Sequence, residues 1–228
     1  MSTNDILIVI PARAGSKGIP HKNSKILGSK PLIEYSIDVA RQITDDENIC
    51  ITTDDDRVFE IARTINLPVP FRRPVELATD NATTNDVLLH AYEYYHQRGK
   101  DYQKILLLQP TSPFRTAAQV CEAINLYRSD IDMVVSVKPS NAAPVICHED
   151  PDGYLTFSLN KNAGRRQDMN PYYEYNGAIY VINPNSLRQK SMAHFDKKIK
   201  YVMDETTSLD IDTPLDWDIA EYLLQRLF

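Results

Sequence analysis

Apolar runs alternate with segments of helical periodicity from the first residues of the chain to Val137. Four apolar runs predict strands, at 6–11, 48–53, 104–110 and 132–137. Between them, apolar residues recur at helical spacing over 31–43, 54–67, 83–98 and 116–127. Strands that alternate with helices are typical of parallel βαβ units. This part of the chain therefore predicts an α/β fold with a doubly wound, mostly parallel sheet.

The pattern changes after Lys138. Residues 139–176 are rich in Pro, Asn, Gly and Tyr and contain only short strand-like pieces, such as "YLTFSL" at 154–159. Two further strands are predicted at 177–183 and 198–203, and a terminal helix at 213–227. We therefore expect a single domain over 1–228, interrupted by a small β-rich excursion at 139–176.

Composition and charge exclude several classes of protein. The net charge of −6 argues against a nucleic-acid-binding surface as the main function. No apolar run reaches the roughly 18 residues that span a bilayer. The apolar run of the first strand is too short for a signal peptide, so we expect none. Cys50, Cys121 and Cys147 form no CxxC pair, so we expect a reducing cytoplasm and three small, buried cysteines.

A cationic loop follows the first predicted strand. The segment "GSKGIPHKN" at 15–23 contains Lys17 and Lys22 and comes just after Arg13. In open α/β sheets, ligands bind beyond the carboxyl ends of the strands. Glycines let a backbone approach an anion closely, and Arg and Lys neutralise its charge. The loop matches neither GxxxxGK[ST] nor GxGxxG, so it predicts a phosphate site that differs from those of P-loop and Rossmann proteins.

Two acids alternate near the end of the chain, in "SLDIDTP" at 208–214. In an extended segment this spacing directs Asp210 and Asp212 to one face and Ile211 to the other. Two facing carboxylates repel each other, and Mg²⁺ relieves the repulsion while it binds substrate phosphates. The alternative is that these acids cap the last helix. We interpret a third acidic cluster, Asp54–Asp56, mainly as the start of a helix.

The loop and four later segments together resemble the cytidylyltransferases that activate 2-keto-3-deoxy sugar acids, the CMP-sialic acid synthetase family. In the family's order, the segments are "IPARAGSKGIPHKN", "RRPVELATDNATT", "LLLQPTSPFR", "NGAIYVIN" and "SLDIDTPLDW". The resemblance implies a nucleotide-diphospho-sugar-transferase-like fold, a Mg²⁺ cofactor, and a homodimer built on the excursion. It also implies that CMP passes from CTP to the anomeric hydroxyl of a nonulosonic acid. N-acetylneuraminate is the expected acceptor, and legionaminate or a related 2-keto-3-deoxy sugar acid is the alternative.

The resemblance assigns the triphosphate to the loop. Arg13, Ser16 and Lys17 are expected to hold the phosphates. Lys22 is expected to meet the α-phosphate, where charge rises in the transition state, with Asn23 beside the nucleotide. Arg13, Lys22 and Asp212 are therefore the candidate catalytic residues.

Two further segments are assigned to the base or ribose and to the acceptor sugar. Arg73 and the stretch from Ala82 to Thr84 are expected to recognise the cytosine edge or ribose. A structural salt bridge is the alternative for Arg73, and a helix cap for Thr84. Gln109, at the end of a buried strand, is expected to bind substrate, with a satisfied structural amide as the alternative.

The remaining acceptor residues lie in the excursion. Arg166 is expected to grip the sugar carboxylate with its planar guanidinium, and Gln167 lies next to it in the sequence; a solvated arginine pair is the alternative. Some bacterial sialic acid enzymes carry an arginine near Glu174 and a lysine near Ile146, which this chain lacks, so the sugar stays open. A non-catalytic nucleotide-binding module would show a degraded loop or acid pair, and both are intact here.

Overall fold

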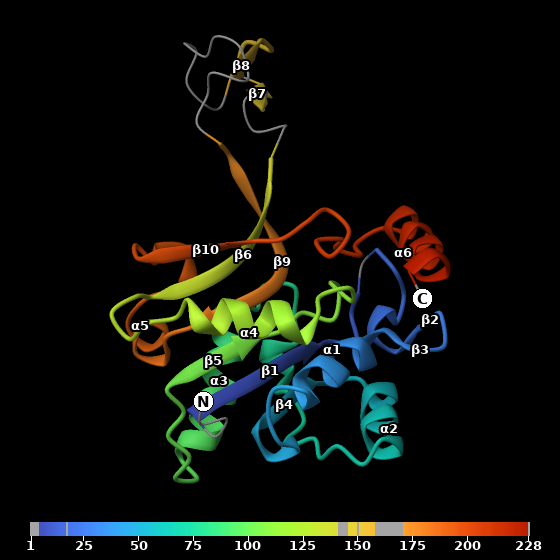
Figure 1. Ribbon diagram of the computed structural model, residues 1–228, viewed down its shortest axis with the longest axis vertical. Helices are drawn as coiled ribbons and strands as arrows, with labels where there is room; N and C mark the ends of the chain where they lie inside the picture. Colours follow the sequence, from blue (N-terminus) through green and yellow to red (C-terminus); the bar gives the residue numbers. More distant parts are fainter. Residues whose placement is uncertain (1–4, 17, 141–145, 150, 158–170, 228) are drawn as a thin grey trace.

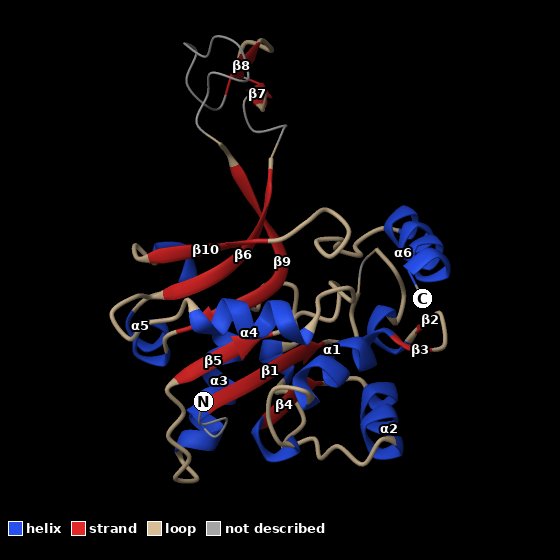
Figure 2. Cartoon of the chain, viewed as in Figure 1, coloured by secondary structure: helices blue, strands red, loops and turns tan. Residues whose placement is uncertain are grey.

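The computed structural model describes residues 5–16, 18–140, 146–149, 151–157 and 171–227. Lys17, Arg166 and Gln167 lie outside the described residues, so their predicted roles stay predictions. Within the described ranges, a six-stranded sheet with helices on both faces forms the body of the protein (Figures 1 and 2).

The sheet is mixed but mostly parallel, and its strand order is β10-β6-β9-β5-β1-β4. The strands are β1 (Ile6–Ala12), β4 (Ile49–Thr53), β5 (Lys104–Leu107), β6 (Met133–Pro139), β9 (Tyr173–Ile182) and β10 (Lys198–Val202). β1 runs parallel to β4 and β5, and β10 runs parallel to β6. Only β9 is antiparallel to its neighbours β5 and β6. The predicted α/β class with a mostly parallel sheet is confirmed.

Helices cover both faces of the sheet, which explains why its central strands are apolar throughout. On one face, Ile8 and Ile10 of β1 belong to a core that includes α1 (Leu32–Arg41), α2 (Asp56–Thr64) and α4 (Ala117–Asn125). On the other face, Leu7 and Val9 pack in a core with α3 (Thr84–His96) and α5 (Pro184–Gln189). β1 is therefore held rigidly from both sides, and so is the start of the loop that follows it.

A third apolar cluster packs against the loop that follows β1. It joins the loop, the β2–β3 hairpin (Ile26–Leu27 and Lys30–Pro31) and the C-terminal helix α6 (Pro214–Leu227). Ile19 from the loop, Ile211 and Trp217 are all nearly inaccessible to solvent in this cluster. The cluster thus holds the segment before α6 against the loop after β1.

The N-terminal cap of α3 corrects one of the alternatives given by the sequence. Thr83 is the N-cap of α3 and forms a capping box with Asp86, so the alternative of Thr84 as a cap is wrong. Thr84 is the first residue of the helix and is exposed. Thr83 can form this capping box because Asp86 lies three residues further on, whereas Thr84 has Val87 at that spacing.

β6 and β9 continue past the body of the sheet as a paired arm, with Lys138 opposite Glu174 and Pro139 opposite Tyr173. Beyond their ends, Figure 1 shows a separate hairpin of β7 (Cys147–Glu149) and β8 (Leu155–Phe157). The structure describes only part of 139–176, and the division of the chain into one domain and an excursion stays a prediction.

The cysteine prediction is correct for one residue. Cys50 is buried in β4, whereas Cys121 and Cys147 are exposed, so the expectation that all three are buried is wrong. Cys121 lies on the outer face of α4, since the buried residues of this helix are Val120, Ala123 and Ile124. In the described ranges, no helix has the length and apolar character that crossing a membrane requires.

Candidate active site

A cavity of about 480 Å³ lies beyond the carboxyl ends of β1 and β5. Two loops and the segment before α6 enclose it. Its lining comprises Pro11, Arg13, Ser16, Gly18, Lys22, Asn23, Gln109, Thr111 and Asp212. The cavity therefore brings together many of the predicted triphosphate, acceptor and metal residues from segments about 100 positions apart in the sequence. This is the position at which open α/β sheets bind ligands.

A larger cavity of about 640 Å³ lies between the β2–β3 hairpin and α6. It is lined by Ile26, Gly28, Ser29, Tyr35, Glu221, Leu224 and Gln225. None of these described lining residues is a lysine or arginine, so the cavity offers no cation to a triphosphate. The smaller cavity is the better anion site.

Two hydrogen bonds and one close backbone approach fix the loop after β1. The backbone N–H of Ala14 donates to Asp54 Oδ1 at 2.9 Å, and Asn23 Nδ2 donates to the Arg13 carbonyl at 3.1 Å. A Cβ on Gly18 would lie only 2.0 Å from the Asp212 carbonyl oxygen. Position 18 therefore requires glycine, because the loop backbone touches the segment before α6 there.

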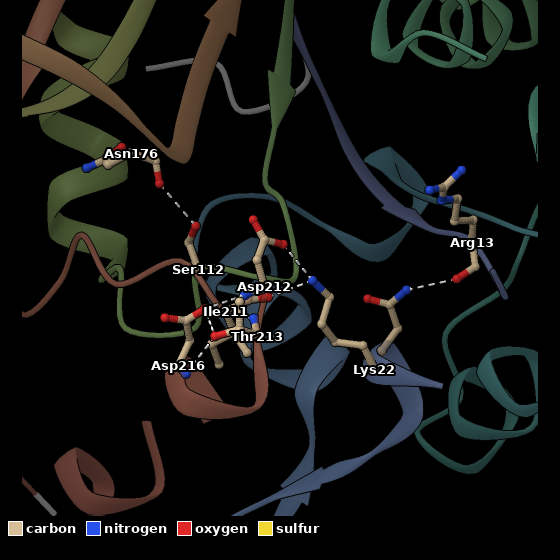
Figure 3. Close-up of polar contacts among 9 residues, drawn as sticks. Arg13, Lys22, Ser112, Asn176, Ile211, Asp212, Thr213 and Asp216 are labelled. Carbon is tan, nitrogen blue, oxygen red and sulfur yellow. Dashed lines mark hydrogen bonds and ion pairs between the residues drawn. The ribbon is translucent and has the colours of Figure 1, made fainter. Parts of the chain in front are cut away.

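Lys22 bridges the loop and the acid pair. Its Nζ donates to the Ile211 carbonyl at 2.6 Å and to Asp212 Oδ1 at 2.9 Å (Figure 3). The Lys22 side chain is only 10% exposed, while that of Asp212 is 70% exposed. The aliphatic stem of Lys22 is thus buried and fixed, and its ammonium group stands at the wall of the cavity.

Arg13 also lines the cavity, but its guanidinium contacts another loop. Nη1 donates to the Thr79 carbonyl at 3.1 Å and lies 3.0 Å from Asp80 Oδ1. In Figure 3 the Arg13 side chain is directed away from Lys22. Both partners of the ion pair are partly exposed, so it stabilises the fold weakly and a bound anion could compete for Arg13.

The acid pair has one partly buried and one exposed member. Ile211 between them is fully buried, as the alternation predicts. Asp210 Oδ1 is buried and has no hydrogen-bond partner among the described residues. Burial raises the pKa of Asp210, and the nearby Asp212 and Asp216 raise it further, while Thr111 and Lys22 act in the opposite direction.

The acid pair does not cap the last helix, so that alternative is wrong. Instead, Asp216 Oδ2 accepts the N–H groups of Asp212 at 3.1 Å and Thr213 at 2.7 Å. The hydroxyl of Thr213 accepts from the N–H of Asp216 at 3.3 Å. Asp216 and Thr213 therefore satisfy the first turn of α6, and the carboxylates of Asp210 and Asp212 take no part in this cap.

These carboxylates fit Mg²⁺ by their chemistry. They offer hard oxygen ligands, and the buried Oδ1 of Asp210 lacks a partner in the described part of the chain. The described ranges contain no group of three or more His, Cys, Asp or Glu residues that could hold a metal ion. A cation at Asp210 and Asp212 would therefore complete its coordination with water molecules and, when substrate is bound, with phosphate oxygens, as Mg²⁺ commonly does.

Arg115 supports the wall that carries Gln109, a role that the sequence analysis did not identify. The fully buried guanidinium donates through Nη1 to the Gln109 carbonyl at 2.8 Å and to the Ser112 carbonyl, and through Nη2 to Ser36 Oγ. Burial lowers the pKa of Arg115 to about 9, and Asp210 opposes this shift. The signal in the sequence was an arginine directly after an apolar strand and a proline turn.

Three predicted nucleotide residues lie outside the lining of the cavity. Arg73 is buried, where Nε donates to Thr52 Oγ1 at 3.1 Å and Nη2 donates to the Thr52 carbonyl. Burial lowers the pKa of Arg73 to about 10, with Arg13 acting in the same direction and Asp54 against it. Ala82 is half-buried and Thr84 is exposed. The contacts of Arg73 are hydrogen bonds to β4 and include no ion pair within the described residues, so a salt bridge is not what holds it.

The three acids after β4, Asp54–Asp56, each have a different partner. Asp55 caps α2 by accepting the N–H of Arg57 at 2.9 Å, as the sequence predicts for a helix start. Asp56 pairs with Arg72. Asp54 holds the loop at Ala14 instead, and sequence reasoning missed this role because the two residues are 40 positions apart.

Comparisons with known proteins bear on the family and the fold of the chain. A model of the cytidylyltransferase family matches residues 7–225. CMP-N,N'-diacetyllegionaminic acid synthase from Legionella pneumophila is 34% identical over 223 residues, which are 96% of each chain. N-acylneuraminate cytidylyltransferase from Escherichia coli is 36% identical over 225 residues, which are 97% of this chain and 52% of that protein, so this chain spans about half of its length.

A solved structure shares the fold. The structure of CMP:2-keto-3-deoxy-manno-octonic acid synthetase complexed with CTP superposes with a TM-score of 0.72, covering 98% of this chain and 99% of that chain. The two sequences are 18% identical, so this likeness concerns the fold alone.

Proposed function

The chain belongs to the cytidylyltransferase family, and on that premise we propose that it transfers CMP from CTP to a nonulosonic acid, with N-acetylneuraminate as the acceptor. The anomeric hydroxyl oxygen attacks the α-phosphorus, the bond to the β-phosphate breaks, and pyrophosphate leaves as the hydroxyl gives up its proton. The observation that carries this proposal is the contact of Lys22 with Asp212 in the wall of a cavity lined by the cationic loop.

Legionaminate, or a related 2-keto-3-deoxy sugar acid, is the second candidate acceptor. A relative that matches this chain over 96% of both lengths bears the name of a legionaminic acid synthase. The chain also lacks an arginine near Glu174 and a lysine near Ile146. The reaction at the phosphorus is the same for either sugar.

The triphosphate binds to the loop after β1 in this account. Arg13, Ser16 and Lys22 line the cavity there, and Lys17 follows Ser16 in the sequence. Phosphoryl chemistry needs mainly positioning and neutralisation of charge, which a loop held by Asp54 and Asn23 supplies. Arg73 and the stretch from Ala82 to Thr84 are assigned to the base and ribose. Arg13, which lines the cavity, donates to the carbonyl of Thr79, three residues before Ala82.

Lys22 acts where charge develops. Its stem is buried and its ammonium group is fixed by Ile211 and Asp212, so it meets the α-phosphate without first being ordered. A preorganised cation stabilises the transition state more than a mobile one does. Asp210 and Asp212 would hold Mg²⁺, which when bound neutralises phosphate charge.

The acceptor site combines Gln109 with Arg166 and Gln167. Gln109 lines the same cavity as Lys22, within reach of a sugar hydroxyl. The carboxylate of the sugar needs a cation, and the guanidinium of Arg166 can bind it with two parallel hydrogen bonds.

The protein is proposed to work as a cytoplasmic homodimer. The arm and its hairpin expose several large apolar side chains, namely Ile146, Tyr154, Leu155, Tyr173 and Tyr175. Such clustering of exposed apolar groups marks a protein–protein contact. A two-fold dimer built on the arm would bury these side chains.

A pyrophosphate-release assay tests the proposed function. Purified protein is supplied with CTP, MgCl₂ and, in separate reactions, N-acetylneuraminate, legionaminate, pseudaminate and 3-deoxy-manno-octulosonate. We expect release with N-acetylneuraminate, and the ranking of the other sugars identifies the preferred acceptor. Release with none of the sugar acids would contradict the proposal.

A further inference from the structure

Asn176 lies at the centre of a buried polar network in the sheet. The residue is only 3% exposed. Its Oδ1 accepts from Ser136 Oγ at 2.6 Å and from the N–H of Ala178 at 3.2 Å. Ser136 lies where the register of β6 and β9 shifts, and its Oγ also accepts from the N–H of Ile179 at 2.7 Å. This half of the network anchors Asn176 to two central strands.

The other half of the network reaches the walls of the active site. Asn176 Nδ2 donates to Ser208 Oγ at 2.8 Å, and Ser208 is buried two residues before Asp210. The Asn176 carbonyl accepts from Ser112 Oγ at 3.4 Å (Figure 3). Ser112 follows Thr111, whose carbonyl accepts from the N–H of Ile211 at 2.8 Å. Asn176 thus contacts the segment before Asp210 through its side chain, and the loop that contains Thr111 and Ser112 through its backbone carbonyl.

The next residue, Gly177, brings β9 against Asp210. Gly177 has a φ of 75°, and a Cβ there would lie 3.4 Å from Asp210 Oδ2. The Asp210 carboxylate therefore rests on the backbone of β9, and its Oδ1 lacks a hydrogen-bond partner among the described residues. An oriented, unpartnered carboxylate oxygen is suited to a cation.

We propose that Asn176 is a positioning residue for the metal site. Through Ser208 and Ser112 it holds the segments around Asp210, so that the carboxylate is placed to bind a divalent cation. The inference rests on the proposed function in one respect, the assignment of Asp210 to the metal. It assigns a task to the segment "NGAIYVIN", for which sequence reasoning found none. A buried polar group that loses its hydrogen-bond partner costs free energy. The buried hydrogen bonds of Asn176 therefore favour the one arrangement of these segments in which all partners are in place.

The direct test measures Mn²⁺ binding by electron paramagnetic resonance, with the metal alone and without nucleotide. Ser208→Ala removes the contact with the Asn176 side chain. We expect Mn²⁺ affinity to fall by roughly 3- to 10-fold, the size of one net hydrogen bond. Ser186→Ala is the matched control, since Ser186 Oγ donates to Asp132 Oδ1 at 2.6 Å and neither residue lines the cavity. The control variant should bind Mn²⁺ as wild type does.

A double-mutant cycle separates positioning from general destabilisation. Asn176→Ala should weaken Mn²⁺ binding more than Ser208→Ala does. If Asn176 acts through Ser208, adding Ser208→Ala to Asn176→Ala should cost little more affinity. The Mg²⁺ concentration for half-maximal activity should rise in both single variants, while the KM for CTP at saturating Mg²⁺ changes less.

Two results would overturn the proposal, and they differ in what else they remove. Wild-type affinity in Ser208→Ala, equal to that of the control, overturns the positioning role alone. Absence of Mn²⁺ binding to the wild-type protein overturns the metal assignment of Asp210 together with the positioning role. If pyrophosphate release failed but the Mn²⁺ affinities still separated as described, the proposed function would fall and the positioning role would stand.

Discussion

Lys22 Nζ lies 2.9 Å from Asp212 Oδ1, although the two residues are 190 positions apart in the sequence. The pair connects the loop after the first strand to the segment before the last helix. The proposed cation for the nucleotide and a proposed ligand for the metal are therefore neighbours.

Asp212→Asn should lower turnover by at least ~10²-fold, the scale of losing one preorganised electrostatic group. The exposed carboxylate contributes little to folding, and the amide oxygen can still accept from Lys22, so the variant should fold. Turnover is measured by pyrophosphate release at limiting Mg²⁺. Asp218→Asn, an exposed acid on α6, is the control. Near-normal turnover of Asp212→Asn would contradict the assignment of Asp212 as a metal ligand.

Gly18→Ala should destabilise the protein and lower its activity, because the added Cβ would lie 2.0 Å from the Asp212 carbonyl. Overpacking of this kind costs about 1–3 kcal/mol, and each kcal/mol lowers the Tm of a chain this long by about 2–4 °C. Gly15→Ala is a matched control in the same loop, since its Cβ would meet no atom of the described residues within 4 Å. Equal melting temperatures for the two variants would show that the loop does not pack against residue 212.

Arg166→Lys should raise the KM for the sugar acid by roughly 10-fold or more, if one charged hydrogen bond worth about 1.5–3 kcal/mol is lost. The KM for CTP should change far less, because the nucleotide is assigned to the loop after β1. Both constants come from initial rates with each substrate varied in turn, and Arg165→Lys serves as the neighbouring control. A weaker KM for CTP with an unchanged KM for the sugar would reassign this segment to the nucleotide.

The proposed homodimer predicts a mass near twice 26.0 kDa by light scattering at micromolar concentration. Leu155→Asp should shift the protein toward the monomer, because Leu155 is exposed on β8 at 78% and a buried charge at an interface is costly. Val75 is similarly exposed at 81%, but it lies three residues after Arg72, which pairs with Thr53 of the edge strand β4, whereas the arm extends from β6 and β9 near the other edge; Val75→Asp should therefore remain dimeric. A wild-type protein that is monomeric at this concentration refutes the dimer.

The sequence predicts the strands and helices well where a local pattern determines them. β1 was predictable because its residues are apolar without interruption and are buried on both faces. The cap of α3 was also within reach, since Thr83 has Asp86 three residues on, whereas Thr84 has Val87. The antiparallel direction of β9 was not predictable, because pairing between β5 and β6 is decided by contacts far apart in the sequence.

For the site, the sequence predicts which segments meet more reliably than what each side chain contacts. Lys22 was identifiable from the cationic loop and its resemblance to the family, Gln109 from its polarity at a strand end, and Asp212 from the alternation of acids, and the three line one cavity. In the pair "RR", however, nothing local indicates that Arg73 turns inward onto Thr52. Its neighbour Arg72 instead turns outward to the helix start after β4. Buried hydrogen bonds of this kind depend on the assembled fold.

The most direct test of the central claim follows the reaction of CTP with N-acetylneuraminate by ³¹P nuclear magnetic resonance of the nucleotide and its products, in wild type and Lys22→Ala. The account predicts equal amounts of pyrophosphate and a CMP-sugar phosphodiester from the wild-type protein. Lys22→Ala should lower kcat, with a smaller change in the KM for CTP, because Lys22 acts where charge develops. Unchanged kcat in Lys22→Ala, or hydrolysis of CTP without a sugar phosphodiester in the wild type, would contradict the account.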